Sequence, residues 1–284
     1  MVKLRADIDG CGCVRCQTVD GTVLQRSVTD SLRWSGRLVA DRPSILALLL
    51  GVGFVQLLAL VGPTEFELAG AILGVAGVFL ARGYIGVLGR ETLADRNPSA
   101  GSTLLTVLGR FPAFAGAAVL VVALLASSGL FAARVLSQPT RAALQAAGVG
   151  TFTTEVVVLF VVAATVLYLL LKFWFVPEAC FVGGYSPVGA LRTSWRLTTV
   201  HRRKAILVVA GFALLLGVGI LLDTRLADPE SPIALTFRYG ETTVVLRSFG
   251  LSFAGGVRFA FDMGVTALYS GVFVHQYVSG VFDA

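Results

Sequence analysis

The residues that could do chemistry fall into three groups, and the first is a cluster of cysteines. Cys11, Cys13 and Cys16 form a Cys-x-Cys-x-x-Cys pattern near the amino terminus. Three thiolates can bind a soft metal ion, but a closed zinc site needs a fourth ligand. Candidates for that ligand are Asp7, Asp9, Asp20 and Cys180. The alternative, which we favour, is that residues 1–27 are a disordered cytoplasmic tail or lie outside the natural product, so no metal site is predicted.

The second group is a pair of ionisable residues within an apolar stretch. Arg258 and Asp262 lie four residues apart, about one helical turn, in the segment 257–278. Ionisable groups in such surroundings are candidates for gating protons or substrates. The alternative is an ion pair between the two side chains near the outer end of a helix, where the cost of burial is small. We expect the ion pair.

The third group is a cluster of basic residues between two apolar segments. It consists of Arg192, Arg196, Arg202, Arg203 and Lys204. Such a cluster can bind an acidic lipid headgroup or a phosphate, with ~1 kcal/mol per charge near an anionic surface. The same residues can serve only to orient the protein in the membrane. Both interpretations stay open, and this is the functional patch that the sequence favours most.

Residue patterns typical of catalysis are missing. The chain has two histidines, and it contains no Gly-x-Ser-x-Gly elbow, no His-Glu-x-x-His pattern and no phosphate-binding loop. These motifs position nucleophiles, metal ligands and phosphate groups in many enzymes. We therefore predict a protein that is not an enzyme and that needs no cofactor.

The apolar segments that must position these groups are long enough to cross a membrane. The chain is 56% apolar and 14% charged, against about a quarter charged in soluble domains. About twenty apolar residues cross a hydrocarbon core of ~30 Å. We predict an all-α, polytopic membrane domain over residues 28–284. Its six spans are expected at about 44–61, 68–88, 114–133, 156–175, 205–222 and 257–278.

The basic residues alternate from loop to loop. Seventeen Lys and Arg residues lie in the tail and the second and fourth loops, counting Arg82 and Lys172 near the ends of their spans, against five in the intervening loops. Positive residues remain on the cytoplasmic side. We therefore predict a cell-membrane protein with both termini in the cytoplasm. The net charge of +6 has the same origin, so a nucleic-acid partner is not expected.

A short sequence repeat precedes two of the spans. The segments 32–38 and 191–197 agree at five of seven positions, at an offset of 159 residues, and each carries two arginines four residues apart. Basic residues on one side of a helix and apolar residues elsewhere are typical of a helix in the headgroup layer. A degenerate third version covers residues 103–111. The chain thus reads as three transmembrane hairpins, each preceded by a basic interfacial helix.

Glycines in the second span indicate close helix packing. Gly70 and Gly74 have the Gly-x-x-x-Gly spacing, and Gly77 follows after another turn. Such glycines let a second helix approach closely. We expect contact within the chain, and contact between two copies is the alternative.

The loop after the fourth span resembles that of a known superfamily. Its motifs are Val176-Pro177-Glu178-Ala179, Gly184-Tyr185-Ser186-Pro187, Ala190-Leu191-Arg192 and Ser194-Trp195-Arg196-Leu197. They resemble a superfamily of six-helix membrane proteins that includes the membrane domain attached to some glycerophosphodiester phosphodiesterases and stand-alone proteins of bacteria and archaea. The resemblance implies a stand-alone membrane domain without an assigned reaction. The soluble phosphodiesterase barrel of some relatives has no counterpart in this sequence, so its activity is not carried over.

Together these patterns predict a membrane scaffold that interacts with lipids or with another membrane protein. A transporter or permease component is the alternative, because internal repeats often frame a transport site. Such a site needs polar groups from several helices in the middle of the membrane, and the sequence offers chiefly Arg258 and Asp262.

Overall fold

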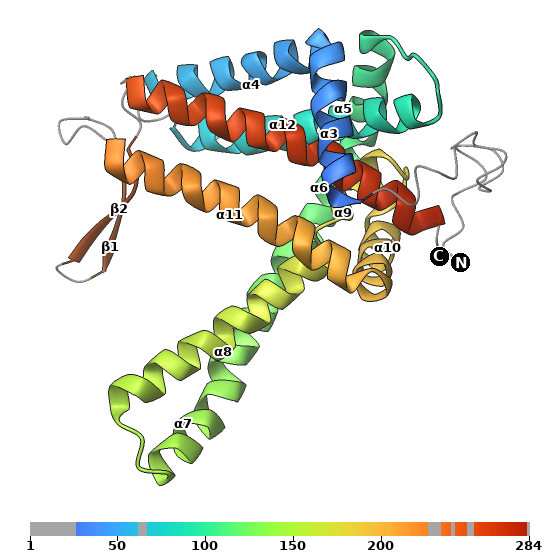
Figure 1. Cartoon of the computed structure of the whole chain (residues 1–284). Helices are drawn as coiled ribbons and strands as arrows, with labels where there is room; N and C mark the ends of the chain where they lie inside the picture. The colour runs from blue at the N-terminus through green and yellow to red at the C-terminus, as the bar shows by residue number, and fades with distance from the viewer. Residues whose placement is uncertain (1–26, 62–66, 227–233, 240–241, 249–252, 283–284) are drawn as a thin grey trace.

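The computed structural model describes residues 27–61, 67–226, 234–239, 242–248 and 253–282. These residues form helices joined by short turns, together with one pair of strands (Figure 1). In chain order the elements are α3 (Val28–Asp41), α4 (Pro43–Val61), α5 (Glu67–Leu93), α6 (Ala100–Phe131), the π-helical η2 (Ala132–Leu136), α7 (Ser137–Ala146), α8 (Thr151–Lys172), α9 (Val176–Phe181), α10 (Pro187–Val200), α11 (Arg202–Leu226), β1 (Ala234–Tyr239), β2 (Thr242–Ser248) and α12 (Phe253–Phe282). Cys11, Cys13 and Cys16 lie outside the described residues.

Six helices coincide with the six predicted spans. Among the described residues, five helical runs are long and apolar enough to cross a membrane: Ile72–Leu93, Ala100–Ala146, Thr151–Phe181, Arg202–Leu221 and Val257–Val281. The sixth is α4, whose 19 residues include no charged side chain and follow α3 after a bend of 82°. The prediction of an all-α, polytopic membrane protein is therefore confirmed, and the last span, at 257–278, is part of α12.

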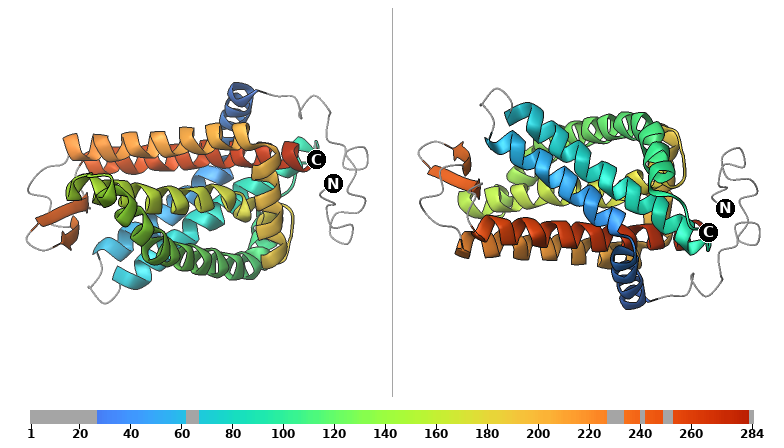
Figure 2. Two further views of the ribbon diagram at one scale, coloured as in Figure 1. Left: turned by 90° about the horizontal axis from the view of Figure 1, so that it is seen from below. Right: turned by 90° about the horizontal axis from the view of Figure 1, so that it is seen from above.

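The basic connections lie together at one end of the molecule, where α9 and α10 are found (Figures 1 and 2). Helix α3 begins beside the last turns of α12, because Ser31 Oγ lies 3.1 Å from His275 Nδ1. The described chain therefore starts and finishes at this same end, while β1, β2 and α7 lie at the other (Figure 2). This arrangement agrees with an even number of spans. The cytoplasmic address of this end stays a prediction from charge.

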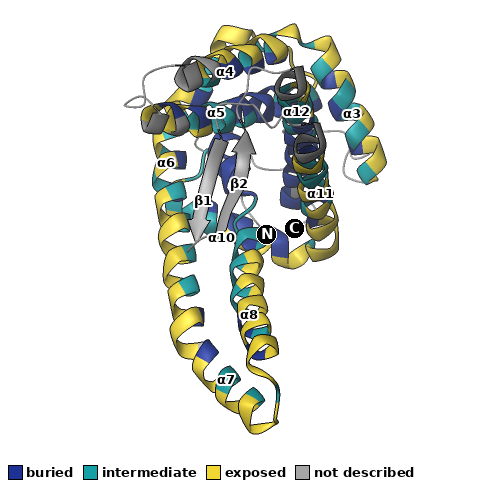
Figure 3. Cartoon of the chain, turned by 90° about the vertical axis from the view of Figure 1, so that its left-hand side faces the viewer, coloured by how far each residue is buried: buried dark blue, intermediate teal, exposed yellow. Residues whose placement is uncertain are grey.

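Helices α5 and α12 form the centre of the molecule. Helices α4 and α6 pack against α5, and α11 packs against α12. Helices α5 and α12 are the most buried spans in the described structure, at 50% and 44% of their apolar windows. Helices α6 and α8 are far less buried, at 11% and 17%. Together with α7 they form an arm that diverges from the other spans (Figures 1 and 3). Most residues of the arm are exposed (Figure 3). Large apolar side chains are among them, for example Leu105, Phe152 and Phe160.

Glycines of α5 let neighbouring helices approach it closely. A Cβ atom at Gly77 would lie 2.9 Å from Val52 of α4, and one at Gly74 would lie 3.1 Å from Gln56. One turn or more further along, a Cβ at Gly83 would lie 2.7 Å from the Phe181 ring of α9. The expectation that Gly74 and Gly77 pack within the chain is confirmed.

The three repeat units begin in the same way. Ser27, Ser99 and Ser186 occupy the N-cap positions of α3, α6 and α10, each with an extended backbone. The hydroxyl groups of Ser27 and Ser99 accept a hydrogen bond from the backbone N–H three residues later. Serine at this position satisfies a backbone donor that has no partner within the helix. The three units therefore share a serine as their start signal.

The repeated residues also share their burial. Eight residues after each N-cap stand Ser35, Ser194 and Val107, and all three side chains are completely buried. Ser35 Oγ donates to the Leu268 carbonyl of α12 (2.6 Å), and Ser194 Oγ donates to the Lys172 carbonyl of α8 (2.8 Å). The repeat thus preserves a small hydroxyl that fastens an amphipathic helix to the backbone of a membrane span. The paired arginines lie on the opposite, exposed side of each helix.

The second unit differs from the predicted pattern. Residues 103–111 are helical as expected, but they continue without a break into the third span as α6, with Pro112 inside the helix. In the first unit Arg42, the residue before Pro43, leaves the helical conformation, as residues before proline tend to do. Helix α6 stays continuous because its buried residues Thr103, Val107, Phe114 and Ala117 form one stripe that runs past the proline. This stripe packs against α9 and α10.

The connection before the last span contains a feature that the sequence analysis did not predict. Strands β1 and β2 pair antiparallel, from Ala234 opposite Ser248 to Tyr239 opposite Thr242, with an irregularity between Leu235 and Thr236. They project from the end of the molecule opposite α9 and α10 (Figure 1). The sequence analysis predicts only a loop between the fifth and sixth spans. A pair of strands outside the apolar layer is compatible with the membrane rule, because its unpaired edge groups can bond to water.

Replacing Gly83 with leucine tests the close contact between α5 and α9. The new side chain would meet the Phe181 ring, so we expect the free energy of unfolding in detergent to fall by ~1–3 kcal/mol. The matched control is Gly109→Leu on α6, where a Cβ meets no atom within 4 Å. Thermal unfolding of the two purified variants measures the difference. Equal stability of the two variants would contradict the close packing.

Candidate functional site

A group of buried residues and polar contacts surrounds α9, the short helix Val176–Phe181. All six of its residues are buried, and the chain enters it from the end of α8 and leaves it toward α10. Pro177 lies in its first turn, where a missing N–H costs nothing. At the other end Gly184 has a positive φ of 61°, which turns the chain toward α10. Pro177 and Gly184 therefore limit α9 to less than two turns.

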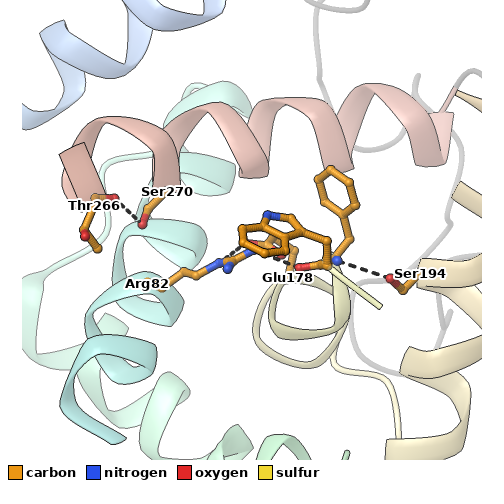
Figure 4. Close-up of polar contacts among 7 residues, drawn as sticks. Arg82, Glu178, Ser194, Thr266 and Ser270 are labelled. Carbon is orange, nitrogen blue, oxygen red and sulfur yellow. Dashed lines mark hydrogen bonds and ion pairs between the residues drawn. The ribbon is translucent and has the colours of Figure 1, made fainter. Parts of the chain in front are cut away.

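A buried ion pair connects α9 to the centre of the molecule. Glu178 has 1% of its side chain exposed, and Arg82 of α5 has 11%. Arg82 Nε donates to Glu178 Oε1 at 2.6 Å and Nη2 donates to Oε2 at 2.9 Å (Figure 4). This two-bond geometry is the strongest arrangement of a guanidinium and a carboxylate. It joins residues 96 positions apart in the sequence.

Aromatic rings and a carbonyl complete the surroundings of Arg82. Its Nη2 also donates to the Trp174 carbonyl at 3.0 Å. The guanidinium carbon lies 4.5 Å from the centre of the Phe273 ring and 5.6 Å from that of Trp174. A cation over an aromatic face is attracted by the ring electrons, and more strongly when water is excluded. Arg82 therefore ties together α5, the turn before α9, and α12.

Two further arginines bind the carboxyl end of α9. Arg110 Nη1 donates to the Phe181 carbonyl and, at 3.2 Å, to the Val182 carbonyl. Arg90 Nη1 also donates to the Val182 carbonyl, at 3.2 Å. The last carbonyls of a helix lack partners within it, and they carry partial negative charge. The two arginines donate hydrogen bonds to these carbonyls and also compensate their partial negative charge.

A second group of polar contacts fixes α10 against the end of α8. Ser194 Oγ donates to the Lys172 carbonyl and accepts a hydrogen bond from the Phe175 N–H at 3.2 Å (Figure 4). Lys172 Nζ donates to Thr199 Oγ1 at 2.8 Å and lies 5.1 Å from the centre of the Trp195 ring. These contacts hold the exposed side of α10 in a fixed position relative to α9.

The ionisable groups around α9 are engaged in contacts that hold neighbouring elements together. The carboxylate of Glu178 is occupied by Arg82, and arginine does not transfer protons at physiological pH. Among the described residues, no three His, Cys, Asp or Glu side chains lie close enough to hold a metal ion. Cys180, which the sequence analysis considered as a distant metal ligand, is buried on α9. The chemical consequence of this cluster is to fix the relative positions of four helices.

The structure brings the five predicted headgroup-binding residues to one corner. Arg192 and Arg196 lie on the exposed side of α10, and Arg202, Arg203 and Lys204 are exposed in the first turn of α11. His201, the C-cap of α10, is the single residue between the two helices. We call this surface the basic corner. It lies at the end of the molecule that holds the other basic connections (Figure 1).

The structure places the predicted intramembrane pair in contact. Arg258 Nε lies 3.3 Å from Asp262 Oδ2 on α12. A Cβ at Gly219 of α11 would lie 2.9 Å from Asp262 Oδ1, so this carboxylate faces the neighbouring helix. The expected geometry of an ion pair is therefore present. The pair lies in the first half of α12, away from the contacts of α9.

The sequence analysis missed Arg82, Arg90 and Arg110 as partners of α9. It includes Glu178 only within a loop motif, and it counts Arg82 only as a charge near the end of its span. The signal available in the sequence was that each of these charged residues stands alone among apolar residues. An ionisable side chain in an apolar span needs a partner. Sequence spacing alone could not reveal which residue supplied that partner.

Changing Glu178 to glutamine tests the buried ion pair. Arg82 would keep its charge without a counter-ion, so we expect the free energy of unfolding to fall by about 3–5 kcal/mol. The control is Glu91→Gln, which breaks a more exposed pair with Arg96 and should cost at most about 1 kcal/mol. The double variant Arg82→Met, Glu178→Met should recover part of the loss. Denaturation in detergent gives all three values, and equal losses for the two single variants would refute the assignment.

The loop motifs that resemble the six-helix superfamily have structural roles in this fold. The Val-Pro-Glu-Ala motif forms α9 with its ion pair, and the Gly-Tyr-Ser-Pro motif contains the positive-φ glycine and the N-cap of α10. The Ser-Trp-Arg-Leu motif contains the buried Ser194. No family model, curated protein or solved structure matches the chain.

Proposed function

We propose that this multi-pass membrane protein is a non-catalytic scaffold that binds anionic lipid headgroups at its basic corner. The observation that carries the proposal is the fixed presentation of five exposed basic residues at the junction of α10 and α11. Four of them, Arg192, Arg202, Arg203 and Lys204, have no carboxylate partner among the described residues. Cations at headgroup level attract anionic lipids, with ~1 kcal/mol for each charge.

The setting of the basic corner supports binding rather than orientation alone. Orientation during insertion requires positive charge in a loop but no defined shape. Here α10 is fastened by Ser194 and Lys172, and its exposed Trp195 ring packs against Phe173 and under the Lys172 ammonium group. Aromatic rings are frequent at the level of the headgroups. Rigid side chains lose less conformational entropy when they bind a ligand.

The arm formed by α6, α7 and α8 supports the scaffold role. Its helices bury little surface against the rest of the chain, and large apolar residues such as Leu105, Phe152 and Phe160 are exposed. In a membrane this surface contacts lipid tails or the helices of another membrane protein. The arm is therefore the surface that we propose for a protein partner. In this proposal the protein belongs with the stand-alone members of the superfamily that its loop resembles.

A transporter or permease component is the second candidate, and one observation favours it. The Arg258–Asp262 pair places two ionisable groups within a membrane span, beside α11. A gate needs polar groups from several helices around a pathway. The neighbouring position on α11 is Gly219, which offers no side chain. We therefore rank transport below the scaffold role.

Lipid binding at the basic corner can be measured directly. We expect the variant Arg192→Gln, Arg202→Gln, Arg203→Gln to bind phosphatidylglycerol at least tenfold more weakly than the wild type, because three charges of ~1 kcal/mol each are removed. The measurement is native mass spectrometry of the detergent-solubilised protein titrated with this lipid.

The control is Arg141→Gln on α7. Arg141 is also exposed, but it pairs with Glu155 at the opposite end of the molecule. Its removal should leave phosphatidylglycerol binding unchanged. Equal affinities for wild type and the triple variant would contradict lipid binding by the basic corner and leave only the orienting role.

A further inference from the structure

An apolar groove lies between α3, α4 and α12, away from both the α9 contacts and the basic corner. Its volume is about 520 Å³, within the range of ~300–1,000 Å³ that is common for small-molecule sites. All eleven lining residues are apolar or glycine, and they include Val39, Leu46, Leu50, Phe259, Met263 and Gly264. Leu46 and Leu50 remain about half or more exposed, so the groove opens toward the membrane.

The groove exists because of a bend and two glycines. Helix α4 leaves α3 at an angle of 82°, which keeps the two helices from closing over α12. Gly36 of α3 and Gly264 of α12 line the space between them. A Cβ atom at Gly264 would meet no other atom within 4 Å. The fold therefore leaves this volume open although the surrounding helices are packed closely.

The groove runs between two contacts of α12. At one end α3 crosses α12, where Ser35 bonds to the Leu268 carbonyl. At the other end Phe259 touches α4 at Gly53. The nine-residue step from Phe259 to Leu268 corresponds to a length of ~14 Å along α12. The groove thus extends from the amphipathic helix α3 along the apolar helix α4.

Positive charge is found at the α3 end of the groove. Arg42 is the single residue between α3 and α4, and the groove residues Val39 and Leu46 lie three positions before it and four after it. Arg37 follows the groove residue Gly36 and is exposed. Within the described part of the chain, neither arginine forms an ion pair with a carboxylate. An apolar channel with cations at one end is complementary to an anionic lipid.

We infer that this groove binds one acyl chain of an anionic phospholipid, whose phosphate lies beside Arg37 and Arg42. The lipid comes from the surrounding leaflet through the open side at Leu46 and Leu50. Bound there, the acyl chain fills the angle between α3 and α4, and the phosphate meets the charge at the bend. The inference extends the proposed lipid-binding function to a second, separate site that uses none of the residues of the basic corner.

Filling the groove tests the inference. Gly264→Leu places a side chain in the open volume, and Gly217→Leu on α11 is the control, because a Cβ there also meets nothing within 4 Å. The probe is phosphatidylglycerol, titrated into the detergent-solubilised protein and counted by native mass spectrometry. We expect Gly264→Leu to lose one tightly bound lipid and Gly217→Leu to keep it. Thermal unfolding confirms that both variants are folded.

A second variant tests the charge without altering the packing. Arg42→Gln should weaken phosphatidylglycerol binding about fivefold, the effect of one interfacial charge. It should leave the weaker binding of phosphatidylcholine unchanged. If wild-type protein binds both lipids equally, the anionic part of the inference is wrong.

Three results would overturn the inference. Retention of the tightly bound lipid by Gly264→Leu excludes the groove as its site. An unchanged affinity in Arg42→Gln excludes the bend as the phosphate site. A wild-type dimer that Gly264→Leu converts to a monomer assigns the groove to a second copy of the chain. The triple variant of the basic corner leaves the groove intact, and Gly264→Leu leaves the basic corner intact. If only one of these two proteins loses bound lipid, the site that is altered in the other protein is the one that does not bind lipid.

Discussion

The ion pair between Arg82 and Glu178 is the contact on which the arrangement of the helices depends. An ionised carboxylate among apolar side chains is stable only when a cation and hydrogen bonds surround it. Glu178 can meet this condition only where α9 lies against α5. Once α9 is placed, its last carbonyls lie within reach of Arg90 and Arg110, and the second half of the chain is attached to the first. A six-residue helix thereby determines how two long hairpins and α12 meet.

The repeat units adapt one local design to different positions. Each unit begins at a serine N-cap and buries the residue eight positions later, whether this is Ser35, Ser194 or Val107. In two units the buried residue is a serine that bonds to the backbone of a neighbouring span. In α6 it is a valine, and the helix continues into the span without a break. The forms of the unit therefore differ in whether the helix is interrupted before its span.

The parts of the fold that could be predicted from the sequence are those with a local signal. Apolar length alone identified the six spans, and the four-residue spacing of Arg258 and Asp262 indicated their ion pair. The β1–β2 hairpin and the continuity of α6 past Pro112 could not be predicted, because tertiary contacts decide both. The same holds for the pairing of Arg82 with Glu178, since 96 residues separate them and either could have bonded elsewhere.

The uneven packing of the molecule indicates where specificity can arise. In lipid, helices gain no hydrophobic energy by association, so a lightly packed arm such as α6 and α8 is stable without a partner. Apolar surface alone also cannot distinguish one lipid tail from another. Discrimination needs charge in a fixed position, and the described structure combines exposed charge with fixed geometry at the bend between α3 and α4 and at the junction of α10 and α11. These two places end repeated amphipathic helices that Ser35 and Ser194 hold. The repeat therefore fixes the helices and, with them, the arginines that we propose as headgroup-binding residues.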